Sequence, residues 1–404
     1  MKLVYIVSWL FALAVSFVSC DDWLDKTPKD RLYPDVYFKT EDELRLFTNQ
    51  FYNNLVPSAV DIYSESSDLI VKSDLMLEMS GQRIIPDEGN GWNFTALRDI
   101  NFYLQYSHNC TEVNARNRYD GVARFFRAYF YFEKVKRYGD IPWYDKALDS
   151  DDPELYKARD SREFVMQKML EDLDFAIANL PKTKNAYVLT RWTALALKSR
   201  VCLFEGTFRK YHGLEDYEKY LNACVSASET FMNESGYTLY KSGSTPYRDL
   251  FASINLQADE VIFGRDYEAS LSVLHNVQNY ENSTTMGRPG MNKKIVNSYL
   301  MADGSRFTDK AGYETMTFDQ ECQNRDPRLA QTIRTPGYTR IGSTKKEAPN
   351  LAYTMTGYHL IKYSMTANYD EYNKSCNDIP LFRTAEVYLN FAEAKAELGT
   401  LKQA

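Results

Sequence analysis

The chain has 404 residues and a formal net charge of −7 at pH 7, which allows one large domain or two smaller ones with a buried core. The acidic balance argues against nucleic acid as a partner, because no basic stripe is available to neutralise phosphates. Tyr is unusually frequent, with 31 residues beside 22 Phe and 5 Trp. Since Tyr joins an apolar face to a polar tip, this excess suits partly solvated contact surfaces as well as cores.

The N-terminus reads as an export signal. Lys2 precedes an apolar run over 3–18, broken only by two Ser, and the run ends in Phe-Val-Ser-Cys. The run is short for a membrane span. A Cys at the expected cleavage position resembles a bacterial lipobox, so we expect residues 1–19 to be a lipoprotein signal peptide and Cys20 to carry lipid. The alternative is a plain secretory signal with a chance Cys.

The other cysteines indicate neither a disulfide framework nor a zinc site, because they are odd in number and lack a C-x-x-C pair. Cys202 and Cys224 fall in apolar helical patterns and are most simply small core residues. The chain also lacks a Walker A sequence, a dinucleotide fingerprint and an EF-hand. We therefore expect no metal and no cofactor.

Residues up to 235 read as successive helices. Thr40 and Glu43 form a capping box ahead of apolar residues at helical spacing, and a second helix is expected over about 95–106. The next carries an aromatic stripe at 122–132 with Arg and Lys on either side. We expect the aromatics to fill the seam between helices, and the basic side chains to lie along the rim with their stems over apolar surface.

Further helices follow in pairs. Gly139 supplies a stop for the aromatic helix, and Asp160 begins a box-like cap for the next. Thr190 opens a helix for which Gly206 is the stop signal, and 215–232 could pair antiparallel with it. Such pairs look like tetratricopeptide hairpins, although their spacing is too irregular for a strict repeat. The expected fold is mainly α, a degenerate tetratricopeptide-like helical array with loop-rich insertions, whose stacked pairs bury a continuous core.

The character of the sequence changes near residue 236. Between 236 and 380, clusters of Gly, Pro, Asn and Ser separate short apolar runs such as 259–264, which predicts loops with a few short strands or helices. A strong helical pattern then returns, with Thr384 as its expected cap. An array helix without its partner leaves an apolar face bare, so we expect the region 236–404 to be truncated.

In their order, these features resemble the SusD/RagB family of outer-membrane nutrient-uptake lipoproteins. Besides the export signal with its lipobox, the likeness rests on GVARFFRAYFYFEKVKRYGDIPW (121–143), EDLDFAIANLP (171–181), TRWTALALKSRVCLFEG (190–206), NRDPRL (324–329) and PLFRTAEVYLNFAEAKAELG (380–399). It spans essentially all of 20–404. The resemblance implies a helical N-terminal region at 20–235 and a SusD/RagB-like C-terminal region at 236–404, with loop-rich insertions that carry the ligand site.

The resemblance also implies a function. Family members are lipid-anchored at the cell surface, in the outer membrane, where they act as lids over a TonB-dependent SusC-like transporter. They capture oligosaccharides, or in some members peptides, and deliver them inward. We therefore expect a glycan-binding lipoprotein without enzymatic activity. Its expected partners are an oligosaccharide or polysaccharide, the SusC-like transporter and, through the lipid anchor only, the membrane.

Sugar binding needs flat aromatic faces for the rings, and amide, carboxylate or Arg groups for the hydroxyls. Trp92 and Asn93 offer this best, because they lie in a Gly-rich loop just before a helix. In members that this chain resembles, that loop often supplies a stacking Trp and a nearby Asn. The alternative is that Trp92 packs against its own helix. Tyr63 and Tyr280, both in polar stretches, and Arg288 as a hydroxyl donor are weaker candidates, for which ordinary surface structure is the competing interpretation.

Trp143 and Tyr144 follow a helix stop and could be mistaken for a binding pair. Their Gly-Asp-Ile-Pro-Trp context belongs to the scaffold resemblance, so we interpret both as packing residues.

Catalysis is poorly supported. The four His residues are scattered, with neither an H-E-x-x-H nor a serine-elbow context. Paired carboxylates lie on helical polar faces or in an acidic loop, where solvated charge is the simpler interpretation. A lipid-anchored glycoside hydrolase, which would need two carboxyls facing one cleft, is the less favoured alternative. A peptide-binding member of the same family and a helical adaptor that binds only protein are the others.

Overall fold

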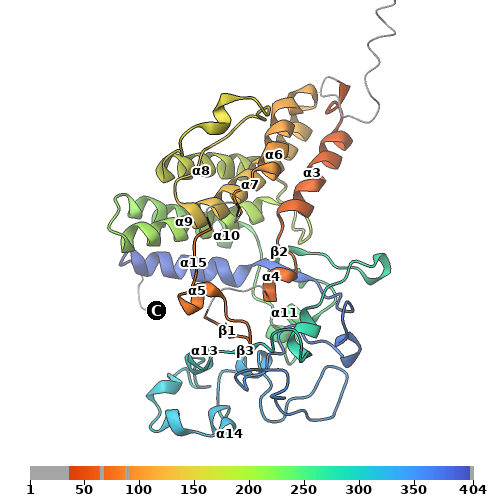
Figure 1. Ribbon diagram of the computed structural model, residues 1–404, viewed down its shortest axis with the longest axis vertical. Helices are drawn as coiled ribbons and strands as arrows, with labels where there is room; N and C mark the ends of the chain where they lie inside the picture. The colour runs from red at the N-terminus through yellow and green to blue at the C-terminus, as the bar shows by residue number, and fades with distance from the viewer. Residues whose placement is uncertain (1–35, 64–67, 87–88, 90, 401–404) are drawn as a thin grey trace, which may run out of the picture.

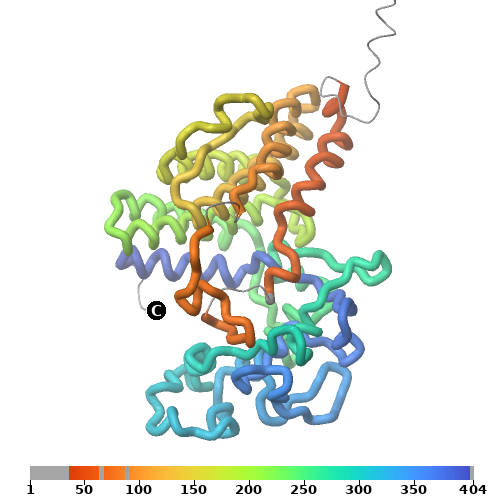
Figure 2. The backbone as a smooth tube through the Cα atoms, viewed as in Figure 1, coloured from red at the N-terminus to blue at the C-terminus, as the bar shows by residue number. Residues whose placement is uncertain are grey.

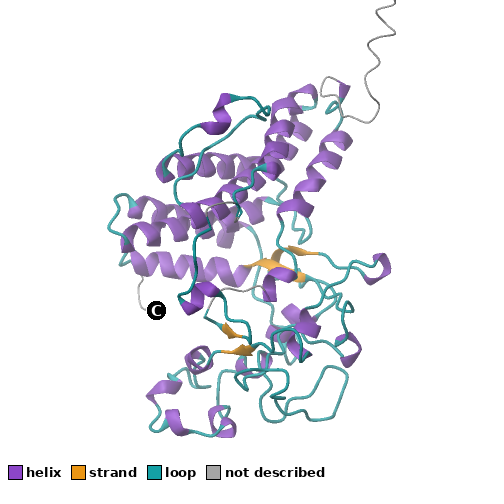
Figure 3. Ribbon diagram, in the orientation of Figure 1, coloured by secondary structure: helices purple, strands orange, loops and turns teal. Residues whose placement is uncertain are grey.

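The computed structural model describes residues 36–63, 68–86, 89 and 91–400. A helical region occupies one half of the molecule and a loop-rich region the other (Figure 1, Figure 2). Colouring by secondary structure shows that the few strands lie between these halves and within the loop-rich one, which confirms the mainly α fold (Figure 3). The expected signal peptide and Cys20 lie outside the described residues.

The helical region is a stack of long helices. These are α3 (Glu41–Leu55), α6 (Thr95–Tyr106), α7 (Val113–Tyr138), α8 (Arg162–Asn179), α9 (Arg191–Tyr211), α10 (Tyr217–Glu234) and α15 (Thr384–Glu397). Neighbours in the stack pack directly on one another, α7 with α8, α8 with α9, α9 with α10 and α10 with α15. One large apolar cluster runs through it, which confirms the predicted helical array.

Local capping signals fix two of the helix starts. At α3, the Thr40 hydroxyl accepts from the Glu43 backbone N–H, and the Glu43 carboxylate accepts from the Thr40 N–H, so the predicted capping box is confirmed. Thr190 opens α9 as predicted, in a reciprocal arrangement with Thr193. Each cap satisfies backbone donors that the first turn of a helix leaves unpaired.

At two other helix starts the predicted cap is wrong by one residue. Ser161 caps α8, because the Asp160 carboxylate instead accepts from the Trp143 backbone N–H at 2.7 Å. The α15 helix begins at Thr384 itself, whose hydroxyl donates to the Glu260 carbonyl at 2.9 Å. In both cases a tertiary contact takes the side chain that the local pattern assigned to a cap.

The α7 helix carries the aromatic stripe, which is buried as predicted against α3, α6 and α8. The flanking basic side chains lie on aromatic rings rather than on aliphatic surface alone. The Arg124 guanidinium is 4.1 Å from the centroid of the Phe175 ring, and the Lys136 ammonium is 4.7 Å from that of Phe132. Gly139 ends the helix with a φ of 70°, which a residue with a side chain adopts only with strain.

Gly206 does not end α9, contrary to the prediction. The helix continues to Tyr211, and Gly206 lies where α9 meets α10. A Cβ atom at this position would come within 2.7 Å of the Leu221 side chain. The missing side chain therefore permits a close approach between two helices, which a single helix pattern cannot reveal.

The loop-rich region contains only short elements. Its helices are α4 (Val60–Tyr63), α5 (Leu77–Ser80), α11 (Pro246–Ala252), α12 (Val277–Asn282), α13 (Lys293–Ser298) and α14 (Phe318–Glu321). Strand β1 (Ile70–Val71) pairs antiparallel with β3 (Gly290–Met291), and β2 (Val261–Arg265) pairs antiparallel with β4 (Ile379–Arg383), with register irregularities in the second pair. These elements confirm the prediction of loops with a few short strands and helices.

The β2–β4 pair leads directly into α15, which returns the chain to the helical region (Figure 1). Asn390 on α15 donates to the Ser199 hydroxyl of α9 at 3.0 Å, and the Lys210 ammonium lies 2.8 Å from the Glu397 carboxylate. The α10 helix also packs against α15. Helices α9 and α10 therefore cover one face of α15, whereas Leu389 of α15 is 68% exposed, so the expectation of a bare apolar face stays a prediction.

The described cysteines are all unpaired, and Cys202 and Cys224 are fully buried, as predicted for small core residues. No group of three or more His, Cys, Asp or Glu within the described ranges is arranged to hold a metal ion. Among the helices that the structure describes, none has the length and apolar character needed to cross a bilayer.

Candidate ligand-binding site

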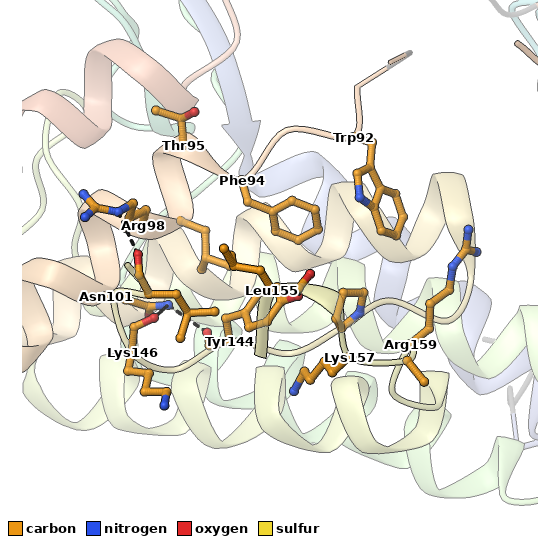
Figure 4. A pocket seen from close by; sticks show the side chains of 14 residues that line it. Trp92, Phe94, Thr95, Arg98, Asn101, Tyr144, Lys146, Leu155, Lys157 and Arg159 are labelled. Atoms are coloured by element: carbon orange, nitrogen blue, oxygen red, sulfur yellow. Dashed lines mark hydrogen bonds between the residues drawn. The ribbon is translucent and has the colours of Figure 1, made fainter. Parts of the chain in front are cut away.

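A cavity of about 540 Å³ opens beside the first turns of α6. Its walls come from two segments, the start of α6 with the loop before it and the connection between α7 and α8 (Figure 4). The two segments meet because Gly139 stops α7 and the chain then runs back across α6. The volume is in the range of roughly 300–1,000 Å³ that is usual for small-ligand sites.

Trp92, which the sequence predicted to contact a ligand, forms one end of this cavity, and the contact itself stays a prediction. Trp92 is 39% exposed, and its ring meets the rings of Tyr138 and Phe94 edge-on at centroid distances of 4.9 and 5.4 Å. The Arg159 guanidinium lies 4.9 Å from the centroid of the Trp92 ring. The contacts with its neighbours hold the ring in place while part of it remains open to the cavity, so packing and ligand contact are compatible at this residue.

Asn93 lies next to Trp92 but does not line the cavity. Its Oδ1 accepts a hydrogen bond from the Thr95 backbone N–H at 2.8 Å, in the turn that begins α6. The side chain thus satisfies one of the unpaired donors at the start of the helix. Contact between Asn93 and a ligand stays a prediction.

Two aromatic residues that sequence reasoning did not select also line the cavity. Phe94 and Tyr144 meet edge-on at a centroid distance of 5.7 Å. Burial, with the carboxylates of Glu154 and Asp160, raises the pKa of Tyr144, so its hydroxyl stays a hydrogen-bond donor near neutral pH. The cavity therefore has three aromatic side chains, and the hydroxyl of one of them, Tyr144, donates to the Leu155 carbonyl at 3.3 Å.

Trp143 and Tyr144 have opposite roles, although both were interpreted as packing residues. Trp143 is buried and stacks on Tyr131 at a centroid distance of 4.3 Å, which confirms packing for that residue. Tyr144 lines the cavity, so the interpretation was incomplete for it. The sequence feature that could have separated the two residues is the extended stretch after Pro142, because successive side chains of an extended chain point to opposite faces.

A buried ion pair between α7 and α8 supports the cavity wall that contains Tyr144. The Arg127 guanidinium on α7 donates to both carboxylate oxygens of Asp172 on α8, at 2.6 and 2.7 Å, and also to Asn101 Oδ1 at 3.3 Å. Asn101 in turn donates to the Tyr144 carbonyl at 2.8 Å. Burial alone would lower the pKa of Arg127, but the bonded charge of Asp172 outweighs it and raises that pKa. The chain from Asp172 to Tyr144 ties the cavity wall to the array.

Lys134 fixes the loop that carries Trp92. Its ammonium donates to the Gly91 carbonyl and lies 4.9 Å from the centroid of the Phe130 ring. Burial and the neighbouring charge of Arg137 lower the pKa of Lys134. Lys134, one of the basic residues that flank the aromatic stripe of α7, thus has a structural role, because it joins the helix to the loop that carries Trp92.

The three weaker sequence candidates lie elsewhere. Tyr63 is the last residue of helix α4, and its side chain is not among the described parts. Tyr280 lies in helix α12 and is only 3% exposed, so the expectation of a polar surface position is wrong. Arg288 is half-buried and donates to the Leu351 carbonyl at 2.6 Å. None of them lines the cavity that contains Trp92.

Fold and cavity together define a class of protein: a helical array with a loop-rich second region and an aromatic-walled pocket at the edge of the array. Family models identify the family. Residues 250–404 match the model described as the SusD family, and residues 81–191 match the model described as starch-binding, associating with the outer membrane. The second match includes the whole lining of the cavity. The chain belongs to the SusD/RagB family.

Individual relatives agree with this assignment. The chain is 25% identical to the SusD-like protein P2 of Formosa agariphila, over 96% of this chain and 76% of the relative. A SusD-like carbohydrate binding protein of Bacteroides fragilis has the same fold, with a TM-score of 0.71, 18% identity, and coverage of 91% of this chain and 76% of the other. A structure with a xylogluco-oligosaccharide matches at a TM-score of 0.58 and 17% identity, covering 87% and 70% of the two chains.

Proposed function

We propose that this protein binds oligosaccharides in the cavity between α6 and the α7–α8 connection. The observation that carries the proposal is the Trp92 ring, which is held at its edges and open to a cavity whose other walls include Phe94 and Tyr144. Sugar rings present apolar C–H faces that stack on aromatic rings, and their hydroxyls need nearby donors and acceptors. The similar fold whose structure contains a xylogluco-oligosaccharide supports the same ligand class.

The proposal includes no catalytic step. None of the described residues that line the cavity is Asp or Glu, whereas glycoside hydrolysis ordinarily uses two carboxyl groups at one cleft. The protein would act as a capture device at the cell surface, held in the outer membrane through lipid on Cys20. It would pass its ligand to a SusC-like TonB-dependent transporter, which supplies the energy-coupled step. The description of the matched family model, which names association with the outer membrane, supports this location.

The test is affinity gel electrophoresis of the purified protein through a panel of plant, host and microbial polysaccharides. We expect retardation by at least one polymer, and Trp92→Ala should weaken that binding about tenfold or more, because a stacking aromatic with its buried area contributes roughly 1–2 kcal/mol. Tyr372→Ala removes an aromatic side chain that is 71% exposed elsewhere, and it should leave binding unchanged.

Equal loss in both variants would contradict a specific site at Trp92. If no polymer retards the folded protein, binding of a panel of peptides is measured by calorimetry instead. Binding of a peptide that is lost in Trp92→Ala would replace the glycan by a peptide as the ligand of this cavity.

A further inference from the structure

The cavity that contains Trp92 is lined by cations in a protein that is acidic as a whole. Four basic side chains line it, and the described lining contains no carboxylate, while the chain has a formal net charge of −7. The basic residues are Arg98, Lys146, Lys157 and Arg159. Cations gathered at a concave surface raise the local concentration of anions and favour ligands that carry negative charge.

Two of these cations are already neutralised by the protein. The Lys146 ammonium lies 3.7 Å from the Asp152 carboxylate, and the Lys157 ammonium lies 3.0 Å from that of Asp160. Lys157 also donates to the Trp143 carbonyl at 2.7 Å. Each of the two lysines thus forms an ion pair with a carboxylate of the α7–α8 connection.

The two arginines are different, because no carboxylate of the described residues forms an ion pair with either of them. Arg98 donates through Nε to the Leu148 carbonyl at 3.2 Å, a neutral partner that positions the side chain without cancelling its charge. Arg159 lies over the Trp92 ring at 4.9 Å, also a neutral partner. A guanidinium above an aromatic ring keeps N–H groups that can donate to an anion.

Figure 4 shows these arginines at opposite ends of the cavity, with the aromatic side chains between them. A ligand that stacks on Trp92 therefore brings its substituents next to Arg159, and one that extends along the wall approaches Arg98. The hydroxyl oxygens of a neutral sugar can accept hydrogen bonds from these guanidinium groups, but they leave both positive charges without a counter-charge. Carboxylate and sulfate groups supply that counter-charge through paired N–H···O bonds.

We propose that the ligand of this cavity is an acidic oligosaccharide, whose carboxylate or sulfate groups bind to Arg98 and Arg159 while a sugar ring stacks on Trp92. This inference rests on the proposed glycan-binding function and names the substrate class. Uronate carboxylates and sulfate esters share the chemistry that the arginines recognise, so the experiment must distinguish them.

The experiment measures binding of the purified protein to matched pairs of polysaccharides. Each uronate polymer, such as polygalacturonate or alginate, is paired with its carboxyl-reduced derivative, and each sulfated polymer, such as carrageenan or chondroitin sulfate, with its desulfated derivative. The variants are Arg98→Gln and Arg159→Gln. Arg45→Gln is the control, because it removes the same charge from an exposed position on α3, outside the cavity, where Arg45 pairs with Asp42.

We expect binding to at least one acidic polymer, weakened at least tenfold by neutralising that polymer and about tenfold by either cavity variant, since each change removes a charge-assisted hydrogen bond. Binding should also weaken as ionic strength rises. Arg45→Gln should bind as the wild type does. The polymer pair whose acidic member binds more tightly than its neutral derivative identifies the anionic group as carboxylate or sulfate.

Three outcomes would overturn the inference: preference for the neutral member of a pair, equal binding to both members, or binding that the two cavity variants leave unchanged. If neutral glycans bind in a manner that depends on Trp92, the proposed function stands and only the acidic ligand class is wrong. If the folded protein binds no polymer of either kind, both proposals fail.

Discussion

Arg127 and Asp172 form the buried pair beneath the cavity, and their side chains are 9% and 3% exposed. Both side chains are shielded from water; Arg127 donates to Asp172 and to Asn101, and the Arg124 guanidinium also lies 3.8 Å from the Asp172 carboxylate. The pair joins α7 to α8 at the point where both support the Tyr144 carbonyl through Asn101. Its role is therefore to hold the position of the cavity wall as well as to stabilise the fold.

Asp172→Ala should lower the free energy of unfolding by about 3–5 kcal/mol, because it leaves the Arg127 charge buried without its partner. Asp174→Ala on the same helix is the matched control, since its carboxylate pairs with Lys198 at a largely exposed position. That change should cost under about 1 kcal/mol. Urea unfolding of both variants measures the two effects, and similar losses would contradict a special role for the buried pair.

At the scale of the elements, two glycines inside long helices occupy different surroundings. A Cβ at Gly206 in α9 would lie 2.7 Å from the Leu221 side chain and 3.1 Å from its backbone nitrogen. A Cβ at Gly121 in α7 would lie 3.4 Å from Leu180, an ordinary contact distance. Glycine is required at the first site by the α9–α10 contact and is not required at the second.

Gly206→Ala should therefore destabilise the protein by roughly 1–3 kcal/mol, because the two helices must move apart or Leu221 must change conformation. Gly121→Ala should stabilise it by roughly 0.5–1 kcal/mol, since alanine restricts the unfolded chain and fits the helix. Thermal and urea unfolding of the pair would show the opposite signs. Stabilisation by both substitutions would mean that the α9–α10 contact adapts without cost.

Across the whole molecule, the two regions are held together by different means. The helical region has a large apolar cluster, whereas the loop-rich region has small apolar clusters and buried polar groups. At the centre of the latter, Glu281 accepts hydrogen bonds from the Ser364 hydroxyl at 2.7 Å and the Tyr363 N–H at 3.2 Å. Burial raises the pKa of Glu281 to about 7, although these bonds and nearby arginines oppose the shift.

The raised pKa of Glu281 predicts a pH dependence of stability. A carboxyl group whose folded-state pKa lies above its unfolded value binds its proton more tightly in the folded protein, so its contribution increases as pH falls from about 8 towards 5. The free energy of unfolding of the wild type, measured relative to Glu281→Gln, should therefore rise by about 2–3 kcal/mol between these pH values.

Using the difference between two proteins removes the opposing contribution of His275 and His359, whose pKa values are lowered by burial to about 4 and about 3. Their contribution is lost as pH falls below the ordinary histidine value, and it is common to wild type and variant. Urea unfolding at pH 5 and pH 8 supplies the data, with Glu371→Gln on the exposed surface as a control for the lost charge. A difference that does not change with pH would exclude a protonated Glu281.

The sequence by itself determined what depends on near neighbours along the chain. The capping box of Thr40, the buried stripe of α7 and the aromatic loop at Trp92 were all predictable, because their signals lie within a few residues. The order of the motifs also identified the family, and the change of composition near residue 236 indicated the loop-rich region.

Only the tertiary structure decided what depends on contacts between distant segments. Gly206 has the appearance of a helix stop until α10 is placed against it, and Tyr280 has that of a loop residue until its burial in α12 is seen. Tyr144, Arg98 and Arg159 become a site only when the α7–α8 connection lies across α6. The physical reason is that burial, charge neutralisation and ligand access belong to surfaces that several segments share, and no single segment contains them.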